Sequence, residues 1–131
     1  MQTNAYARYK DQSLSTMAPG ELLVKLYDEL IKQCRLAVIY IQNKDFAAAN
    51  NSLMKSQTIV STLDSSLDMR FPISKDLHNF YLFFNKQLRK ANLEKNVNVI
   101  NELVPLMKDL RDSFAQAEKL SRSSQHGGKA I

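Results

Sequence analysis

The chain of 131 residues is long enough for one domain with a substantial core, and 44% of its residues are hydrophobic. It has only three prolines and three glycines, so tight turns are few and helices are favoured over sheets. The net charge of +5 comes from 18 Lys and Arg against 13 Asp and Glu, mixed along the chain, which is typical of solvated helix faces and weakens the case for binding to nucleic acid.

The cysteine content and the hydropathy of the chain bear on its cellular compartment. Cys34 is the only cysteine, which excludes an intramolecular disulfide, and its place in an apolar helical pattern predicts a buried structural thiol. Residues 1–15 are polar and lack the apolar core of a signal peptide. No apolar run approaches the ~20 residues that span a bilayer. We therefore expect a cytoplasmic protein without membrane insertion.

The first predicted helix covers residues 19–42. Its apolar residues recur at steps of three and four, the period of an amphipathic helix. This stripe consists of Leu23, Tyr27, Leu30, Cys34, Ala37 and Ile41. Pro19 suits the first helical position, where the missing N–H has no intrahelical partner in any case. Ala18 is then an N-cap without a side-chain acceptor, and Glu21 compensates by reaching back to the Ala18 amide.

The second predicted helix covers residues 46–67, and Asp45 is its expected N-cap. Its stripe consists of Ala49, Leu53, Ser56, Val60, Leu63 and Leu67. The pattern breaks at residues 69–72, where a proline ends any continuous helix.

The third predicted helix begins after Ser74 as its N-cap, and the fourth follows a polar break at residues 94–96. Their stripes are Leu77, Tyr81, Phe84, Leu88 and Ala91 on the third helix, and Val99, Leu103, Leu106, Leu110, Phe114 and Ala117 on the fourth. Pro105 removes a backbone donor inside the fourth helix and predicts a kink near residue 101. From Ser121 onward the composition predicts a flexible tail.

Four helices with short connections and one apolar face each predict an all-α fold, an antiparallel four-helix bundle. We expect residues 1–15 to form a mobile N-terminal arm or a short extra helix, residues 16–120 to form the bundle domain, and residues 121–131 to form the tail.

The chain lacks the residues that common catalytic sites require. A di-iron bundle site needs Glu-x-x-His pairs, but Lys75 precedes His78 by three residues and Ser123 precedes His126. His78 is therefore expected at the surface or at a helix end. No histidine lies near Cys34 in the pattern, and no glycine-rich loop for phosphate is present. We predict neither an enzyme nor a cofactor or metal site.

Some apolar residues fall outside the core stripes. They are Leu36, Ile39, Met54, Ile59, Phe80, Leu82 and Phe83. Scattered apolar residues are normal on protein surfaces. The group of Ile59, Phe80 and Phe83, on sequential and adjacent helices, instead favours a groove for a partner helix.

The N-terminal arm adds a second indication of binding. Tyr6 and Tyr9 lie at helical spacing in a polar context and are followed by Leu14, although a free tail has little use for aromatic side chains. One interpretation is a short helix docked permanently on the bundle. The other is that the arm covers the groove and is displaced by the partner.

Several short stretches occur in an order and spacing shared with a known family. They are Tyr6 and Tyr9; Thr16, Pro19, Glu21 and Leu22; Leu26-Tyr27-Asp28; Ala49, Asn50, Leu53, Lys55, Gln57, Ile59, Leu63, Leu67 and Asp68; Leu77 through Leu88 with Ala91-Asn92; and Leu110-Arg111-Asp112. Together they resemble the FliS family of flagellar secretion chaperones, from Tyr6 to Leu120.

The resemblance implies a helical bundle that keeps flagellin unassembled in the bacterial cytosol before export. It implies that the bundle wraps the C-terminal segment of flagellin and that the N-terminal arm occupies part of the site when flagellin is absent. We expect a one-to-one complex, with the flagellar export apparatus as a further partner. The candidate partner-binding residues are Tyr6, Tyr9, Leu14, Gln57, Ile59, Phe80 and Phe83, of which the last three follow from helical geometry alone.

The chain departs from the family pattern at four positions. Ala18 replaces a usual serine cap, Gly20 an acidic residue, Phe114 a tryptophan and Pro105 a small residue. None of these changes removes the apolar groove.

Two other functions stay open at the level of sequence. A basic module around Lys86, Arg89 and Lys90 predicts nucleic-acid binding with a steep salt dependence. A structural bundle predicts self-association through the surplus apolar face.

Overall fold

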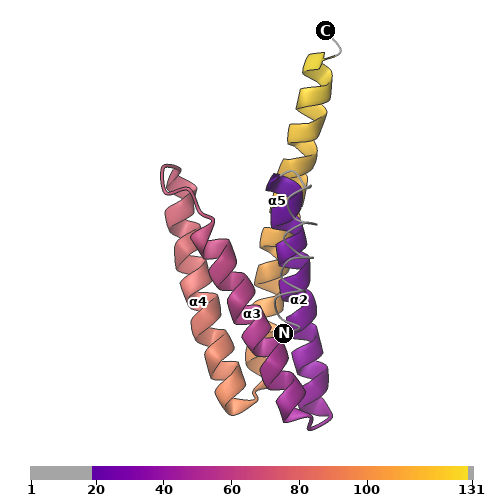
Figure 1. Ribbon diagram of the computed structural model, residues 1–131, viewed down its shortest axis with the longest axis vertical. Helices are drawn as coiled ribbons and strands as arrows, with labels where there is room; N and C mark the ends of the chain where they lie inside the picture. Colours follow the sequence, from indigo (N-terminus) through magenta and orange to yellow (C-terminus); the bar gives the residue numbers. More distant parts are fainter. Residues whose placement is uncertain (1–18, 130–131) are drawn as a thin grey trace, which may run out of the picture.

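The computed structural model describes residues 19–129, with side chains to residue 123. The described chain forms four α-helices and no strand: α2 (Pro19–Gln42), α3 (Phe46–Ser65), α4 (Pro72–Glu94) and α5 (Val97–Lys129) (Figure 1). The predicted all-α four-helix architecture is therefore confirmed. Residues 1–18, which include the predicted arm with Tyr6, Tyr9 and Leu14, lie outside the described residues.

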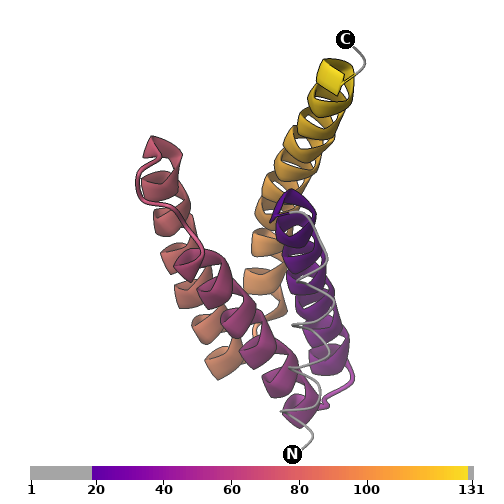
Figure 2. The ribbon, with the colours of Figure 1, turned by 45° about the horizontal axis from the view of Figure 1, so that its top comes forward.

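The helices alternate in direction and pack in the order of the chain. The α2 helix packs on α3 and α5, α3 also packs on α4, and the smallest of these interfaces joins α4 to α5. In two views the ends of α3 and α4 near their connecting loop diverge from α2 and α5 (Figures 1 and 2). The bundle is therefore less tightly closed along the α4–α5 side.

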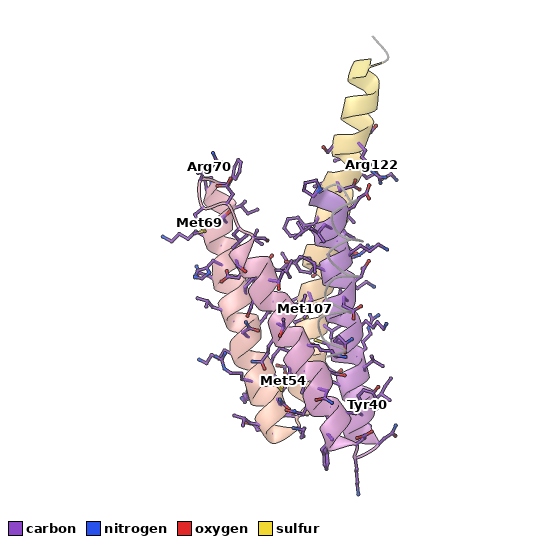
Figure 3. All side chains as sticks on the ribbon, viewed as in Figure 1. Tyr40, Met54, Met69, Arg70, Met107 and Arg122 are labelled. Carbon is purple, nitrogen blue, oxygen red and sulfur yellow. The ribbon has the colours of Figure 1, made fainter. Side chains whose placement is uncertain are left out.

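The predicted stripes supply most of the core. The largest fully buried side chains are Tyr27, Leu30, Cys34, Leu53, Val60, Leu63, Tyr81, Phe84, Leu88, Ile100, Leu103 and Met107. Figure 3 shows Met107 between the helices, whereas Met69 and Arg70 lie at the α3–α4 loop.

The buried stripe of α5 differs from the prediction at several positions, because Leu106 and Ala117 are exposed and Ile100 and Met107 take their place in the core. Ile100, Leu103 and Met107 are buried, whereas Leu106 is 40% exposed. The expectation that Leu106 belongs to the core is wrong, because α5 packs on both α2 and α4 and these two contacts set which face turns inward.

Two of the predicted helix starts are confirmed and one is corrected. α2 begins at Pro19, and the Asp45 carboxylate accepts a hydrogen bond from the Ala48 amide at 3.2 Å. Ser74 is not the N-cap of α4, since the helix begins at Pro72 with Phe71 as its cap residue. Proline favours the first helical position because its φ is preset and its missing N–H is not needed there.

Ser74 has a different role from the predicted one. It is buried in the first turn of α4, and its hydroxyl donates a hydrogen bond to the Asp68 carbonyl at 2.6 Å. This bond ties the α3–α4 loop to the start of α4.

The α5 helix is longer than the sequence predicts. It continues to Lys129, although a tail was expected from Ser121, and it runs through Pro105 as one helix. Its last turns extend beyond the start of α2 (Figure 1). The kink near residue 101 and the division into arm, bundle and tail stay predictions.

Gly20 allows a close approach between α2 and α5. A Cβ atom built on Gly20 would lie 2.6 Å from Cγ of Glu118, which is shorter than any normal carbon contact. Glu118 in turn pairs with Arg122 one turn further along α5, at 2.8 Å. The glycine at this departure from the family pattern therefore leaves room for the Glu118 side chain.

A buried hydrogen bond links two helices that lie diagonally across the core. The hydroxyl oxygens of Tyr27 on α2 and Tyr81 on α4 are 2.7 Å apart, and both side chains are almost fully buried. Burial raises the pKa of both hydroxyls further above their ordinary value, so both remain protonated even at high pH, and one of them donates to the other. This bond satisfies two polar groups that water does not reach.

We predict strong coupling between the two tyrosines. Tyr81→Phe leaves the Tyr27 hydroxyl buried without a partner and is expected to lower the free energy of unfolding by about 1–3 kcal/mol. The double variant Tyr27→Phe/Tyr81→Phe is expected to lose less than the sum of the two single variants. Urea denaturation of all four proteins measures this cycle, and strictly additive losses would contradict the prediction.

Candidate functional site

Two half-exposed aromatic side chains form an apolar patch on α4. Phe80 is 42% exposed and Phe83 is 43% exposed. Both rings contact the fully buried Phe84, with centroid distances of 6.1 Å and 6.2 Å. Phe80 and Phe83 line a shallow hollow of about 430 Å³ together with Asp76 and Asn79. We call these four residues the aromatic patch.

Hydrogen bonds on α4 show which way the aromatic patch faces. His78 and Asn85, seven residues apart and so on one flank, bond to side chains of α3: His78 to Asp64 at 2.6 Å and Asn85 to Ser61 at 3.2 Å. The aromatic patch lies on the opposite flank by helical geometry. It therefore faces the side of α4 that is turned toward α5, where the bundle is least closed.

Exposed apolar residues at the start of α4 and on α5 extend this side of the molecule. Ile73, in the first turn of α4, is 60% exposed. On α5, Arg111 reaches Asp28 of α2, so Leu106 lies on the other flank of α5, the one nearer to α4. The sequence pattern did not predict that Leu106 lies at the surface. The signal for this was a second apolar stripe on the same helix, formed by Ile100, Leu103 and Met107.

Ile59 does not belong to this exposed surface. It is 8% exposed and is part of the core, so the prediction that it is an exposed member of the groove is wrong. The physical reason is that α3 shares the largest interface of the bundle with α2 and also packs on α4, so it buries a wider face than its predicted stripe. Gln57, which follows the buried Ser56 on the same helix, is half-buried.

Most of the other off-stripe residues lie where the sequence places them. Ile39, Met54 and Leu82 are each at least half exposed, at 50%, 54% and 55%. Leu36 is half-buried. Leu82 points away from the aromatic patch on the same helix by its position in the turn, which makes it a matched control for substitutions in the patch.

The described residues offer little reactive chemistry. Among them no three His, Cys, Asp or Glu side chains lie together as a metal site. His78 is half exposed near the start of α4, as predicted, and its Nδ1 lies 2.6 Å from the Asp64 carboxylate. None of the described helices has the length and hydropathy needed to cross a membrane.

Cys34 is a buried structural thiol, as predicted. Its side chain is 0% exposed and contacts Ser56 Oγ at 3.7 Å and Met107 Sδ at 3.9 Å. Burial raises the pKa of the thiol to about 11. Because the thiolate is the nucleophile, only about one thiol in a thousand is reactive at pH 8.

We therefore predict slow modification of Cys34. In the folded protein at pH 8, its reaction with an aromatic disulfide reagent is expected to be at least ~100-fold slower than that of a free cysteine, and urea should restore the full rate. Absorbance of the released thiolate measures both rates. A fast reaction without denaturant would show that the thiol is accessible.

A buried helical core with an exposed aromatic patch on one helix is typical of a helical bundle that binds another protein. Comparison with known proteins identifies its family. Residues 2–121 match the family of flagellar protein FliS, and the chain belongs to this family of flagellar secretion chaperones.

Curated relatives of similar length support the assignment. The chain is 31% identical over 128 residues to the flagellar secretion chaperone FliS of Bacillus subtilis, covering 98% of this chain and 96% of the relative. It is 27% identical to FliS of Campylobacter jejuni, covering 88% of this chain and 93% of the relative.

A solved structure shares the fold. It is described as a flagellar chaperone from bacteria and matches with a TM-score of 0.74 and 19% identity over 91% of this chain and 98% of its own length. The resemblance predicted from short stretches of sequence is thereby confirmed at the level of family and fold.

Proposed function

We propose that this protein is a cytoplasmic export chaperone that binds the disordered C-terminal segment of flagellin in a one-to-one complex. Binding prevents premature polymerisation and keeps flagellin ready for the flagellar export apparatus. The single observation that supports this most is the aromatic patch, because its two half-exposed phenylalanines are not needed to close the bundle core.

The patch suits an amphipathic helix as partner. A flagellin segment that is disordered alone can fold on the bundle and place its apolar face over Phe80 and Phe83. A wrapped segment that buries more than ~1,000 Å² reaches the range of specific complexes, although its ordering subtracts from the affinity. While the segment is covered, it is not available for contacts in the filament.

In this proposal the N-terminal arm regulates the vacant site. Tyr6 and Tyr9 are tethered to the bundle and compete with flagellin at a high effective concentration. Deleting residues 1–10 should therefore raise the affinity for flagellin and lower the solubility of the free chaperone. Unchanged affinity together with unchanged solubility would count against this role of the arm.

One experiment tests the proposed partner directly. The purified protein is mixed with flagellin and, separately, with flagellin that lacks its C-terminal segment, and both mixtures are analysed by size-exclusion chromatography with light scattering. We expect a soluble one-to-one complex in the first mixture only. Equal complex formation in both mixtures would place the binding site on another part of flagellin.

A further inference from the structure

A second surface runs along the seam between α2 and α5. It consists of two adjoining hollows of about 270 Å³ and 390 Å³, and Arg35 lines both of them. We call this surface the α2–α5 groove. The residues that line it and carry the argument are Lys32, Arg35 and Ile39 on α2, and Val104, Pro105 and Lys108 on α5.

One half of the groove is basic and only partly neutralised. Arg111 is engaged on both sides, by Asp28 at 2.8 Å and by Asp112 at 3.3 Å. The other three cations of this half, Lys32, Arg35 and Lys108, form no ion pair with any side chain between residues 19 and 123. These three side chains give the hollow of about 270 Å³ an excess of positive charge.

The other half of the groove is apolar. Val38 and Ile39 of α2 face Val104 and Pro105 of α5 there, and Ile39 is 50% exposed. Pro105 has no N–H, so the carbonyl of Asn101 in the same hollow receives no helical hydrogen bond from residue 105. An acceptor and an apolar surface thus lie together next to the basic half.

We propose that the α2–α5 groove binds an acidic amphipathic segment of a second protein partner. Carboxylates of that segment pair with Lys32, Arg35 and Lys108, and its apolar side chains cover Ile39 and Val104. The centres of the two halves lie roughly two turns of helix apart, or about 11 Å, so a segment of about three to four turns reaches both.

The charges of the groove argue against two other occupants. The N-terminal residues of this chain contain Arg8, Lys10 and a single acid, Asp11, so they do not complement a basic groove. A nucleic-acid backbone would find only Arg35 as a cation in the other half and would leave the apolar side chains of Val38, Ile39 and Val104 uncovered. An acidic segment with apolar residues matches both halves.

The groove and the aromatic patch lie on different sides of the bundle. The α2 helix has its interfaces with α3 and α5, whereas the patch is on α4, diagonally across the core. On α5, the groove is lined by the flank that carries Lys108 and Arg111. Leu106 lies on the opposite flank of this helix. Two partners therefore have room to bind the chaperone at once.

The test uses a labelled synthetic 18-residue helical peptide with three glutamates in its first half and leucines in its second. Fluorescence anisotropy with the full chain at ~0.15 M salt should give a dissociation constant on the order of 10–100 μM, as for a small transient interface. The variant Arg35→Glu/Lys108→Glu should bind at least ~10-fold more weakly.

Matched controls isolate the groove. Lys86→Glu on α4 changes one exposed charge elsewhere and should leave peptide binding unchanged, as should Phe83→Asp in the aromatic patch. Ile39→Ser should weaken binding without altering any charge. Circular dichroism verifies that each variant is folded, and because the assay contains no flagellin, its result is independent of the flagellin experiment.

Several results would overturn the proposal. They are equal binding of a peptide with lysines in place of the glutamates, absence of binding at millimolar peptide, tighter binding of a 20-base-pair DNA duplex, or loss of peptide binding in Phe83→Asp. A dimer in light scattering that disappears in Arg35→Glu/Lys108→Glu would show instead that a second copy of the chain occupies the groove.

Discussion

Replacing Phe80 and Phe83 together with aspartate is expected to weaken flagellin binding at least ~100-fold, or about 2.7 kcal/mol. Both rings are more than 40% exposed, so a partner helix can cover them. Large buried aromatic side chains are the usual centres of binding energy in such interfaces, and two carboxylates under a partner helix remain unpaired. Isothermal titration of flagellin into the variant measures the loss.

The control for this prediction is Leu82→Asp on the same helix. Leu82 is 55% exposed but lies away from the aromatic patch, so this variant should bind flagellin as the unchanged protein does. Urea denaturation should show that all three proteins have similar stability, within about 1 kcal/mol, because the substituted side chains are exposed. Equal loss of binding in Leu82→Asp, or full binding by the double variant, would remove the patch from the site.

Replacing Phe84 with alanine is expected to lower the free energy of unfolding by about 3–5 kcal/mol. Phe84 is fully buried and contacts Phe80, Phe83 and Tyr81, so the change leaves a cavity at the centre of α4. Domains of this size are stable by only about 5–15 kcal/mol, so this single change removes a large part of the stability.

The matched control is the neighbouring residue. Phe83→Ala removes the same number of atoms from a half-exposed position and should cost about 1 kcal/mol or less. Guanidinium denaturation followed by circular dichroism compares the midpoints of the two variants. Similar midpoints would mean that the two phenylalanines are buried to the same degree, which would contradict the arrangement of α4.

The shape of the bundle connects the fold to the proposed function. The α4–α5 interface is the smallest of the bundle, and the aromatic patch lies on that side of α4. A partner helix that packs there adds apolar contacts where the four helices supply the fewest. This arrangement explains how a small bundle keeps a stable core and still presents hydrophobic surface.

The local features of the helices follow from the sequence alone. The spacing of apolar residues predicts the four helices, and the residues at their ends predict the start of α2 at Pro19 and the cap at Asp45. These features depend on neighbours within one or two turns of the chain. The exposure of Phe80 and Phe83 was predictable for the same reason, because both fall outside a well-defined stripe.

Only the tertiary structure decides how wide each buried face is and where it points. Ile59 is buried because α3 shares the largest interface of the bundle with α2 and also packs on α4. Leu106 is exposed because the contacts of α5 with α2 and α4 turn Met107 inward. The α2–α5 groove likewise brings together Arg35 and Lys108, which are far apart in the chain. Periodicity describes one helix at a time, whereas burial depends on the number and direction of the helices packed against it.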